Sequence, residues 1–144
     1  MDRLSPERRS WLMSRVAQKN TKPEMIVRSL AHGLGYRFRL HRSDLPGTPD
    51  IVFPRLRKAI FVHGCFWHRH PGCRLASTPK SRPEFWEPKF RANVERDHRK
   101  EEQLRKAGWD VETIWECETR DPGRLMERLK ATLSEGEKFL SKDV

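Results

Sequence analysis

Side chains that bind metals or stack on flat rings are concentrated in one short stretch of this 144-residue chain. Residues 63–73 hold three histidines, two cysteines and the adjacent aromatic pair Phe66 and Trp67. Histidine nitrogens and cysteine thiolates are the ligands that transition metals take in proteins. The apolar run at residues 59–62, directly before this stretch, predicts a buried strand. Because successive side chains of a strand alternate between its faces, Phe66 and Trp67 are not both expected to point inward.

The three cysteines of the chain, Cys65, Cys73 and Cys117, indicate a metal site rather than disulfides. Their number is odd, and thiols stay reduced in the cytosol. With His70 they form a C-x4-H-x2-C pattern followed by a remote cysteine, which is the ligand set of a closed tetrahedral Cys3His zinc site. Cys65 and Cys117 each follow a predicted strand, so the two thiols meet if these strands are neighbours. His68 remains an alternative to His70, and three unrelated buried thiols remain an alternative to zinc.

A Pro-Asp pair precedes another predicted strand. Pro49 and Asp50 are followed by a short apolar strand, a basic turn and the strand at residues 59–62. This order, with a glutamate-bearing helix before it, is the layout of the PD-(D/E)xK nuclease core, in which the first carboxylate binds Mg2+. The second half of that motif is missing, because Phe61 and His63 stand where an acid and a lysine are expected. A turn residue without a catalytic role remains the alternative for Asp50.

The elements that must position these residues begin with a helix. Thr21 and Glu24 have the spacing of a capping box, and apolar residues follow at helical spacing up to two glycines. Capping is therefore the structural explanation for Glu24. Residues 36–40 alternate apolar with basic side chains, which predicts a half-buried strand. Together with strands at residues 51–53 and 59–62, it is expected to form a three-stranded meander.

The second half of the chain is predicted to contain a loop, a helix, a strand and a final helix. Residues 68–90 contain four prolines and are expected to form a loop that exposes Phe85 and Trp86. A charged helix should span residues 89–107, and a strand should span residues 109–115. The last helix should begin after Asp121.

The chain length predicts one domain, residues 1–144. Within it, residues 1–20 are expected to form a basic N-terminal helix or arm, and the tail from about residue 135 to 144 is expected to fray.

The chain carries a formal charge of +10 and has a pI near 10.1. Such an excess of lysine and arginine favours a polyanionic partner, because neutralising phosphates supplies most non-specific affinity for nucleic acid. The basic residues are scattered rather than gathered on one amphipathic helix, which argues against a membrane surface. No signal peptide or membrane-spanning run is found, so we expect a cytoplasmic protein, associated with the nucleoid when on DNA.

Several separate motifs occur in a fixed order along the chain. They are Asp50, His63-Gly-Cys-Phe-Trp-His68, Glu84-Phe-Trp86, Asn93-Val-Glu-Arg-Asp97 and Trp115-Glu-Cys117. On these motifs the chain resembles the very short patch repair (Vsr) DNA mismatch endonucleases over roughly residues 5–135. The resemblance implies an α/β fold of the restriction-endonuclease type, with a central mixed sheet flanked by helices and a structural zinc.

The resemblance also implies an activity, which is to nick one DNA strand beside a T:G mismatch left by deamination of 5-methylcytosine. It implies Mg2+ bound by Asp50 and the backbone carbonyl of Val62, and His68 as general acid or base with support from His63 and Glu24. It implies zinc on Cys65, His70, Cys73 and Cys117. It further implies that Phe66, Trp67 and Trp86 push into the base stack next to the mismatch.

Double-stranded DNA with a T:G mismatch is therefore the expected partner, and general mismatch repair proteins are candidate further partners. We expect a monomer, because a T:G site is asymmetric and one active site suffices for one nick. One alternative is a zinc-stabilised DNA-binding module without catalysis, which leaves Asp50, His63 and His68 unexplained. The other is a diverged nuclease of the same kind that cuts a different DNA target.

Overall fold

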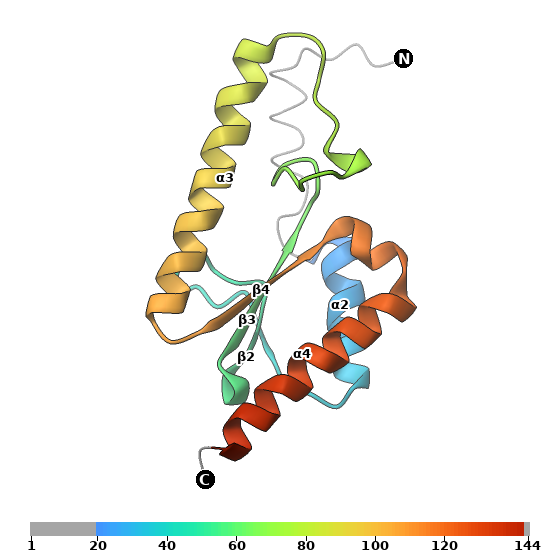
Figure 1. The fold of residues 1–144 in the computed structure, drawn as a ribbon, viewed down its shortest axis with the longest axis vertical. Helices are drawn as coiled ribbons and strands as arrows, with labels where there is room; N and C mark the ends of the chain where they lie inside the picture. The colour runs from blue at the N-terminus through green and yellow to red at the C-terminus, as the bar shows by residue number, and fades with distance from the viewer. Residues whose placement is uncertain (1–19, 143–144) are drawn as a thin grey trace.

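A four-stranded mixed sheet forms the centre of the molecule in the computed structural model, which describes residues 20–142 (Figure 1). The strand order is β1-β2-β3-β4, with the first three strands antiparallel and β4 parallel to β3. The strands are β1 (Arg39–Leu40), β2 (Ile51–Phe53), β3 (Lys58–His63) and β4 (Asp110–Trp115). The predicted meander and the predicted fourth strand are confirmed, although only the last two residues of the segment 36–40 pair as a strand.

Helices cover both faces of this sheet. The helices of the described part of the chain are α2 (Lys22–Gly33), α3 (Pro83–Lys106) and α4 (Pro122–Lys142). In Figure 1, α2 and α4 lie on one side of the sheet and α3 lies on the other. Because strand side chains alternate, Ile51 and Ile60 pack with α2 and α4, whereas Val52 and Phe61 pack with α3. The predicted α/β class with a mixed sheet flanked by helices is confirmed.

The parallel pairing of β3 and β4 brings distant parts of the chain to one edge of the sheet. Two parallel strands need a long crossover, and here it contains α3. The register pairs Val62 with Ile114 and His63 with Trp115 at the ends of the strands. The short helix η3 (Glu116–Arg120) follows directly. The residues just after both strands, including Cys65 and Cys117, therefore lie together.

Helix α3 begins at Pro83, so the expectation of a loop through residue 90 is wrong for its last part. Proline fits the first turn of a helix, where its missing N–H has no intrahelical partner. Pro88 lies inside the helix and removes one backbone hydrogen bond. The helix persists there with Trp86 and Phe90 buried on its inner face.

Helix α4 continues to Lys142, beyond residue 135, where the sequence suggested a frayed tail. Two contacts with the short helix η1 (Pro54–Leu56) accompany this extension. A Cβ atom built at Gly136 would lie 3.4 Å from Leu56 Cβ, so the two segments approach closely there. The Arg55 guanidinium lies 2.6 Å from the Glu137 carboxylate.

The expected basic helix at residues 1–20 lies almost wholly outside the described residues. Among residues 20–142, no helix combines the length and apolar character needed to cross a lipid bilayer.

Candidate active site and metal centres

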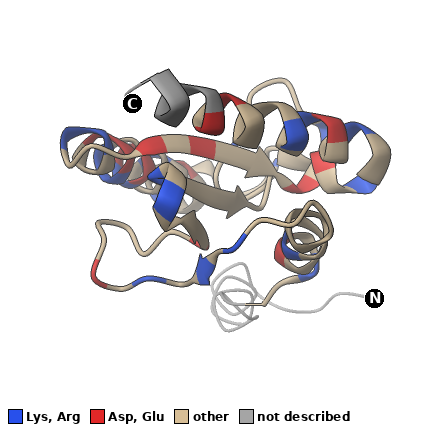
Figure 2. Ribbon diagram, turned by 90° about the horizontal axis from the view of Figure 1, so that it is seen from below, with Lys and Arg blue, Asp and Glu red and all other residues tan. Residues whose placement is uncertain are grey.

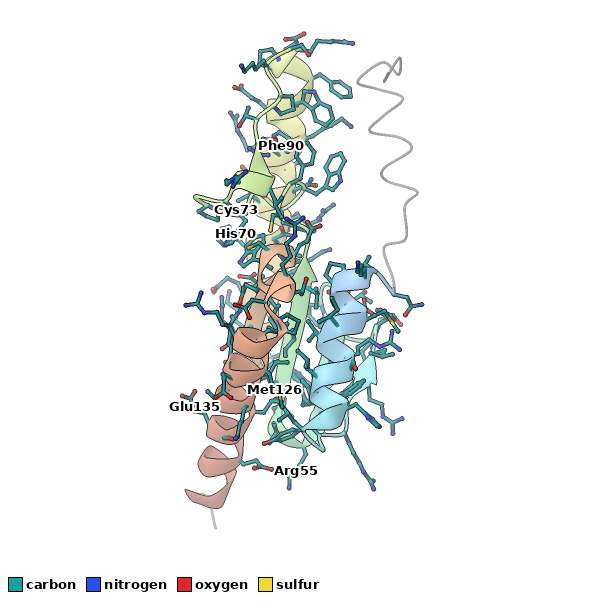
Figure 3. All side chains as sticks on the ribbon, turned by 90° about the vertical axis from the view of Figure 1, so that its right-hand side faces the viewer. Arg55, His70, Cys73, Phe90, Met126 and Glu135 are labelled. Carbon is teal, nitrogen blue, oxygen red and sulfur yellow. The ribbon has the colours of Figure 1, made fainter. Side chains whose placement is uncertain are left out.

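The ligand atoms of Cys65, His70, Cys73 and Cys117 all lie within 4.8 Å of one another. The Nδ1 atom of His70 is 3.7 Å from Cys65 Sγ and 3.5 Å from Cys117 Sγ. Figure 3 shows His70 and Cys73 close together below Phe90. Of the two histidines that the sequence left open, His70 is the one that lies with the three cysteines, and His68 lies in another group.

These separations match what a tetrahedral zinc ion requires. Zn–S bonds of about 2.3 Å and Zn–N bonds of about 2.0 Å place neighbouring sulfur and nitrogen ligands about 3.5 Å apart. The His70 ring is further fixed by stacking on Trp115, with ring centroids 4.3 Å apart. The donor set thus fits a closed structural zinc site.

His68 belongs to a second group, in which its Nδ1 atom lies 2.6 Å from Asp97 Oδ2. Asp97 comes from the middle of α3, and His68 comes from the turn after β3. An imidazole that donates Nδ1–H to a carboxylate has its tautomer and orientation fixed, and its Nε2 atom stays available for proton transfer. His63 stacks on one face of the His68 ring, with ring centroids 3.8 Å apart.

The electrostatics separate the roles of these groups. Burial, followed by the charge of His68, lowers the pKa of His63 to about 3, so its ring is neutral near pH 7. Burial opposes ionisation of Asp97, but the hydrogen bond and charge of His68 outweigh it, and the pKa of Asp97 is lowered overall. The site therefore holds a neutral His63 beside an ionised Asp97 that orients His68.

Asp50 lies immediately before β2 and accepts a hydrogen bond of 2.8 Å from the backbone N–H of Val62. Burial raises the pKa of Asp50 to about 6, an effect that the Val62 bond opposes and the Glu24 charge reinforces. A buried carboxylate with a second carboxylate nearby is stabilised by a bound cation, and divalent hard cations take oxygen ligands. Asp50 and Glu24 therefore fit a divalent metal. The charge of His68 also acts on Asp50, so both groups belong to one site.

The backbone and the side chain of Glu24 make separate contacts at the start of α2. Its backbone N–H donates to Thr21 Oγ1 over 3.3 Å, which confirms Thr21 as the N-cap. Its side chain makes no reciprocal capping bond, however, and instead accepts a hydrogen bond from Arg28 and lies against His41. The capping box predicted from the sequence is thus only half formed, because the carboxylate turns toward the site.

An aromatic cluster lies next to the acid–base group. The ring of Phe66 contacts Trp67, Trp86 and Phe90 at centroid distances of 5.1, 5.8 and 5.3 Å. Trp86 is only 4% exposed, so the expectation that it is exposed in a loop is wrong. The physical reason is that α3 begins early and turns Trp86 inward against Phe66. Phe66 and Trp67 are half-buried and keep part of their surface in solvent.

Two residues of this site were given no role from the sequence, although Asp97 ends one of the motifs that carry the family resemblance. A second signal points to a role for Asp97, because it lies seven residues after Phe90 and seven before Leu104, on the buried side of α3. A carboxylate on an apolar helix face is rarely buried without a partner. His41 carries no comparable signal. It ends a segment in which basic side chains alternate with apolar ones, and this pattern predicts an exposed basic residue.

Lys and Arg residues are spread over all the helices and the segment before β2, with acidic residues among them (Figure 2). Among the described residues, the basic side chains are therefore distributed over several elements rather than forming one helical stripe. A divalent metal held by carboxylates and an oriented imidazole are together suited to hydrolysis of phosphate esters.

Comparison with known proteins agrees with this chemistry. The family model described as DNA mismatch endonuclease Vsr matches residues 1–74. The type II nicking enzyme V.XorIIP of Xanthomonas oryzae pv. oryzae is 61% identical, and the match covers 92% of this chain and 96% of that protein. The DNA mismatch endonuclease Vsr of Escherichia coli is 44% identical, with 81% of this chain and 74% of that protein covered. The type II nicking enzyme V.NmeAIP of Neisseria meningitidis is 37% identical, over 93% of this chain and 95% of that protein.

Proposed function

The chain belongs to the Vsr family of DNA mismatch endonucleases, and from this premise we propose that it nicks one strand of duplex DNA beside a T:G mismatch. Such a nick would begin very short patch repair of deaminated 5-methylcytosine. The observation that carries the proposal is the oriented Asp97–His68 pair next to the buried carboxylate of Asp50.

A magnesium ion is the metal we propose for the Asp50 side of the site. Asp50 would hold it together with the backbone carbonyl of Val62, and Glu24 would add negative charge nearby. A bound Mg2+ supplies Lewis acidity, which polarises the phosphate and makes a bound water more acidic. His68 would exchange a proton through Nε2 while Asp97 holds Nδ1. His63, neutral and stacked on His68, would keep the ring in place without adding a competing charge.

The aromatic cluster provides the proposed mismatch recognition. The half-buried side chains of Phe66 and Trp67 keep part of their surface in solvent, and they are the part of the cluster that would enter the base stack. Aromatic wedges unstack a base step at a cost of a few kcal/mol, and a mismatched base lowers that cost. Trp86 is buried and would support the wedge from below by packing against Phe66. It would reach DNA only if the cluster rearranges.

Zinc on the Cys3His group would hold the loop that carries these side chains. His68 and Trp67 lie between Cys65 and His70 in sequence, so a closed zinc site fixes both ends of their short segment. The Asn93 side chain adds a hydrogen bond of 3.3 Å to the Trp67 carbonyl. A reactive group needs this kind of rigid support.

A panel of duplexes with separately labelled strands tests the proposal. We expect Mg2+-dependent nicking of the thymine-containing strand of a T:G duplex, and far slower cleavage of the C:G duplex and of other mismatches. Equal cleavage of all duplexes would show that the nuclease does not recognise the mismatch. Cleavage of another lesion alone would favour the alternative of a diverged nuclease with a different DNA target. Binding without any cleavage would favour the non-catalytic DNA-binding module.

A further inference from the structure

His41 connects the two acidic residues of the candidate magnesium site. Its ring atom Nε2 lies 2.9 Å from Glu24 Oε1 and 3.0 Å from Glu24 Oε2, so one N–H reaches both carboxylate oxygens. Its backbone N–H donates to the Asp50 carbonyl over 3.0 Å. Ligand-capable atoms of His41, Glu24 and Asp50 all lie within 4.8 Å of one another. His41 thus contacts Glu24 through its side chain and Asp50 through its backbone.

The backbone of His41 is held in an unusual conformation. Its φ is +47°, in the left-handed region that residues with a Cβ atom adopt rarely. Strained backbone of this kind persists only where surrounding contacts hold it, and it is frequent at functional sites. The conformation occurs directly after β1 and coincides with the bond to the Asp50 carbonyl.

The Glu24 carboxylate needs such a contact to stay in place. Its side chain is about 1% exposed, and the charge of Glu24 acts unfavourably on that of Asp50. Arg28, one turn further along α2, donates to Glu24 Oε2 over 3.2 Å. Arg28 contacts one oxygen from the same helix, whereas His41 contacts both oxygens from the sheet side. Of these two residues, His41 is the one that connects the carboxylate to the segment between β1 and Asp50.

We propose that His41 is a positioning residue, which holds the Glu24 carboxylate beside Asp50 and so shapes the site for a divalent cation. The inference rests on the proposed magnesium site. It assigns His41 no contact with DNA and no proton transfer, and it requires only the N–H that points at Glu24.

Two substitutions separate this role from a general effect on folding. His41→Gln keeps an amide N–H that can reach Glu24. His41→Asn suits the left-handed backbone, since asparagine is enriched there, but its side chain is too short to reach the carboxylate. His98→Asn on the exposed side of α3 is the matched control. Each variant is compared for Mg2+-induced change in thermal midpoint without DNA, and for the Mg2+ concentration that gives half-maximal nicking of a T:G duplex.

We expect the Mg2+ concentration for half-maximal nicking to rise at least about tenfold in His41→Asn. This is the usual scale for removing the partner of a metal ligand. Its Mg2+-induced rise in midpoint should shrink in parallel, while nicking at saturating Mg2+ changes less. His41→Gln and His98→Asn should keep the Mg2+ dependence of the unsubstituted protein.

Three outcomes would overturn the inference. Unchanged Mg2+ dependence of His41→Asn would show that Glu24 needs no such support. A lower midpoint with unchanged Mg2+ dependence would leave His41 a purely structural role. A defect in His41→Gln equal to that in His41→Asn would show that the imidazole itself is required. If the unsubstituted protein does not nick with Mg2+, the proposed function fails first, and this inference falls with it.

Discussion

The imidazole rings of His63 and His68 lie face to face, with centroids 3.8 Å apart and planes inclined by 8°. His63 is the buried ring of the two. Burial, together with the His68 charge, lowers the pKa of His63 to about 3, so this ring is neutral near pH 7. Only His68 has a carboxylate partner, Asp97. This arrangement supports the proton-transfer role proposed for His68, and four predictions test the site built around it.

Asp97→Asn should slow nicking at saturating Mg2+ and DNA by on the order of 10²–10⁴-fold, the range for losing an oriented acid–base group. The reason is that the amide fits the same space but no longer stabilises a proton on His68. Binding to a T:G duplex and the thermal midpoint should stay close to those of the unsubstituted protein. Single-turnover nicking and a melting curve measure these quantities. Glu95→Gln, at an exposed position of the same helix, is the control. A rate close to normal would mean that Asp97 only packs against His68.

Asp50→Asn should stabilise the protein when no Mg2+ is present. Burial raises the pKa of Asp50 to about 6, from about 3.9 in an unfolded chain. Folding thus takes up a proton between these values, and the ionised carboxylate destabilises the fold at pH above about 6. The free energy of unfolding should rise by about 1–3 kcal/mol at pH 7.5 and by about half as much at pH 5.

Urea unfolding at the two pH values measures this gain, and the same variant should lose nicking in Mg2+. Asp44→Asn is the control with the opposite sign, because the Arg42 hydrogen bond lowers the pKa of that exposed carboxyl. No gain for Asp50→Asn, or a gain independent of pH, would mean that the Asp50 carboxyl does not titrate as described.

Cys117→Ser should lose bound zinc and be less stable. The physical reason is that structural zinc contributes folding free energy directly, and a hydroxyl is a poor replacement for a thiolate ligand. Metal analysis of the purified protein should give about one zinc per chain before the substitution. His98→Ala, which removes an exposed histidine from α3, should leave that zinc in place. A zinc-free protein that is folded and fully active would contradict the Cys3His site.

Trp86→Ala should mainly lower stability, whereas Trp67→Ala should mainly weaken binding to mismatched DNA. Trp86 is 4% exposed and stacks on Phe90 at 5.7 Å, so truncating it should lower stability by about 3–5 kcal/mol. Trp67 is only half-buried, so its truncation should cost less stability. That variant should weaken binding to a T:G duplex by about 1–3 kcal/mol, with a smaller effect on a C:G duplex.

Melting curves and binding to both duplexes at one salt concentration measure the two effects. Trp86→Phe, which keeps an aromatic ring in the cluster, is the matched control for lost volume. If Trp67→Ala weakens both duplexes equally, its side chain does not read the mismatch.

Local patterns in the sequence were sufficient for the elements of the sheet. The apolar runs at residues 51–53 and 59–62, and the Thr21 cap, depend on neighbours within a few residues, and all three are confirmed. The ligand set of Cys65, Cys73 and Cys117 was also accessible, because the chain has no other cysteines to choose from. Membership in the Vsr family followed from the order of several short motifs and is confirmed.

Tertiary packing alone decided what the side chains between these elements do. Trp86 is buried because α3 begins at Pro83 and turns the ring toward Phe66, which the prolines of the sequence concealed. The bond between His68 and Asp97 spans 29 residues, and the contact between His41 and Glu24 spans 17. Such contacts depend on how a helix crosses the sheet, and this is set by the summed burial of many apolar side chains rather than by any local pattern. The sequence therefore supplied the chemical groups, and the placement of α2 and α3 on opposite faces of the sheet decided which of them meet.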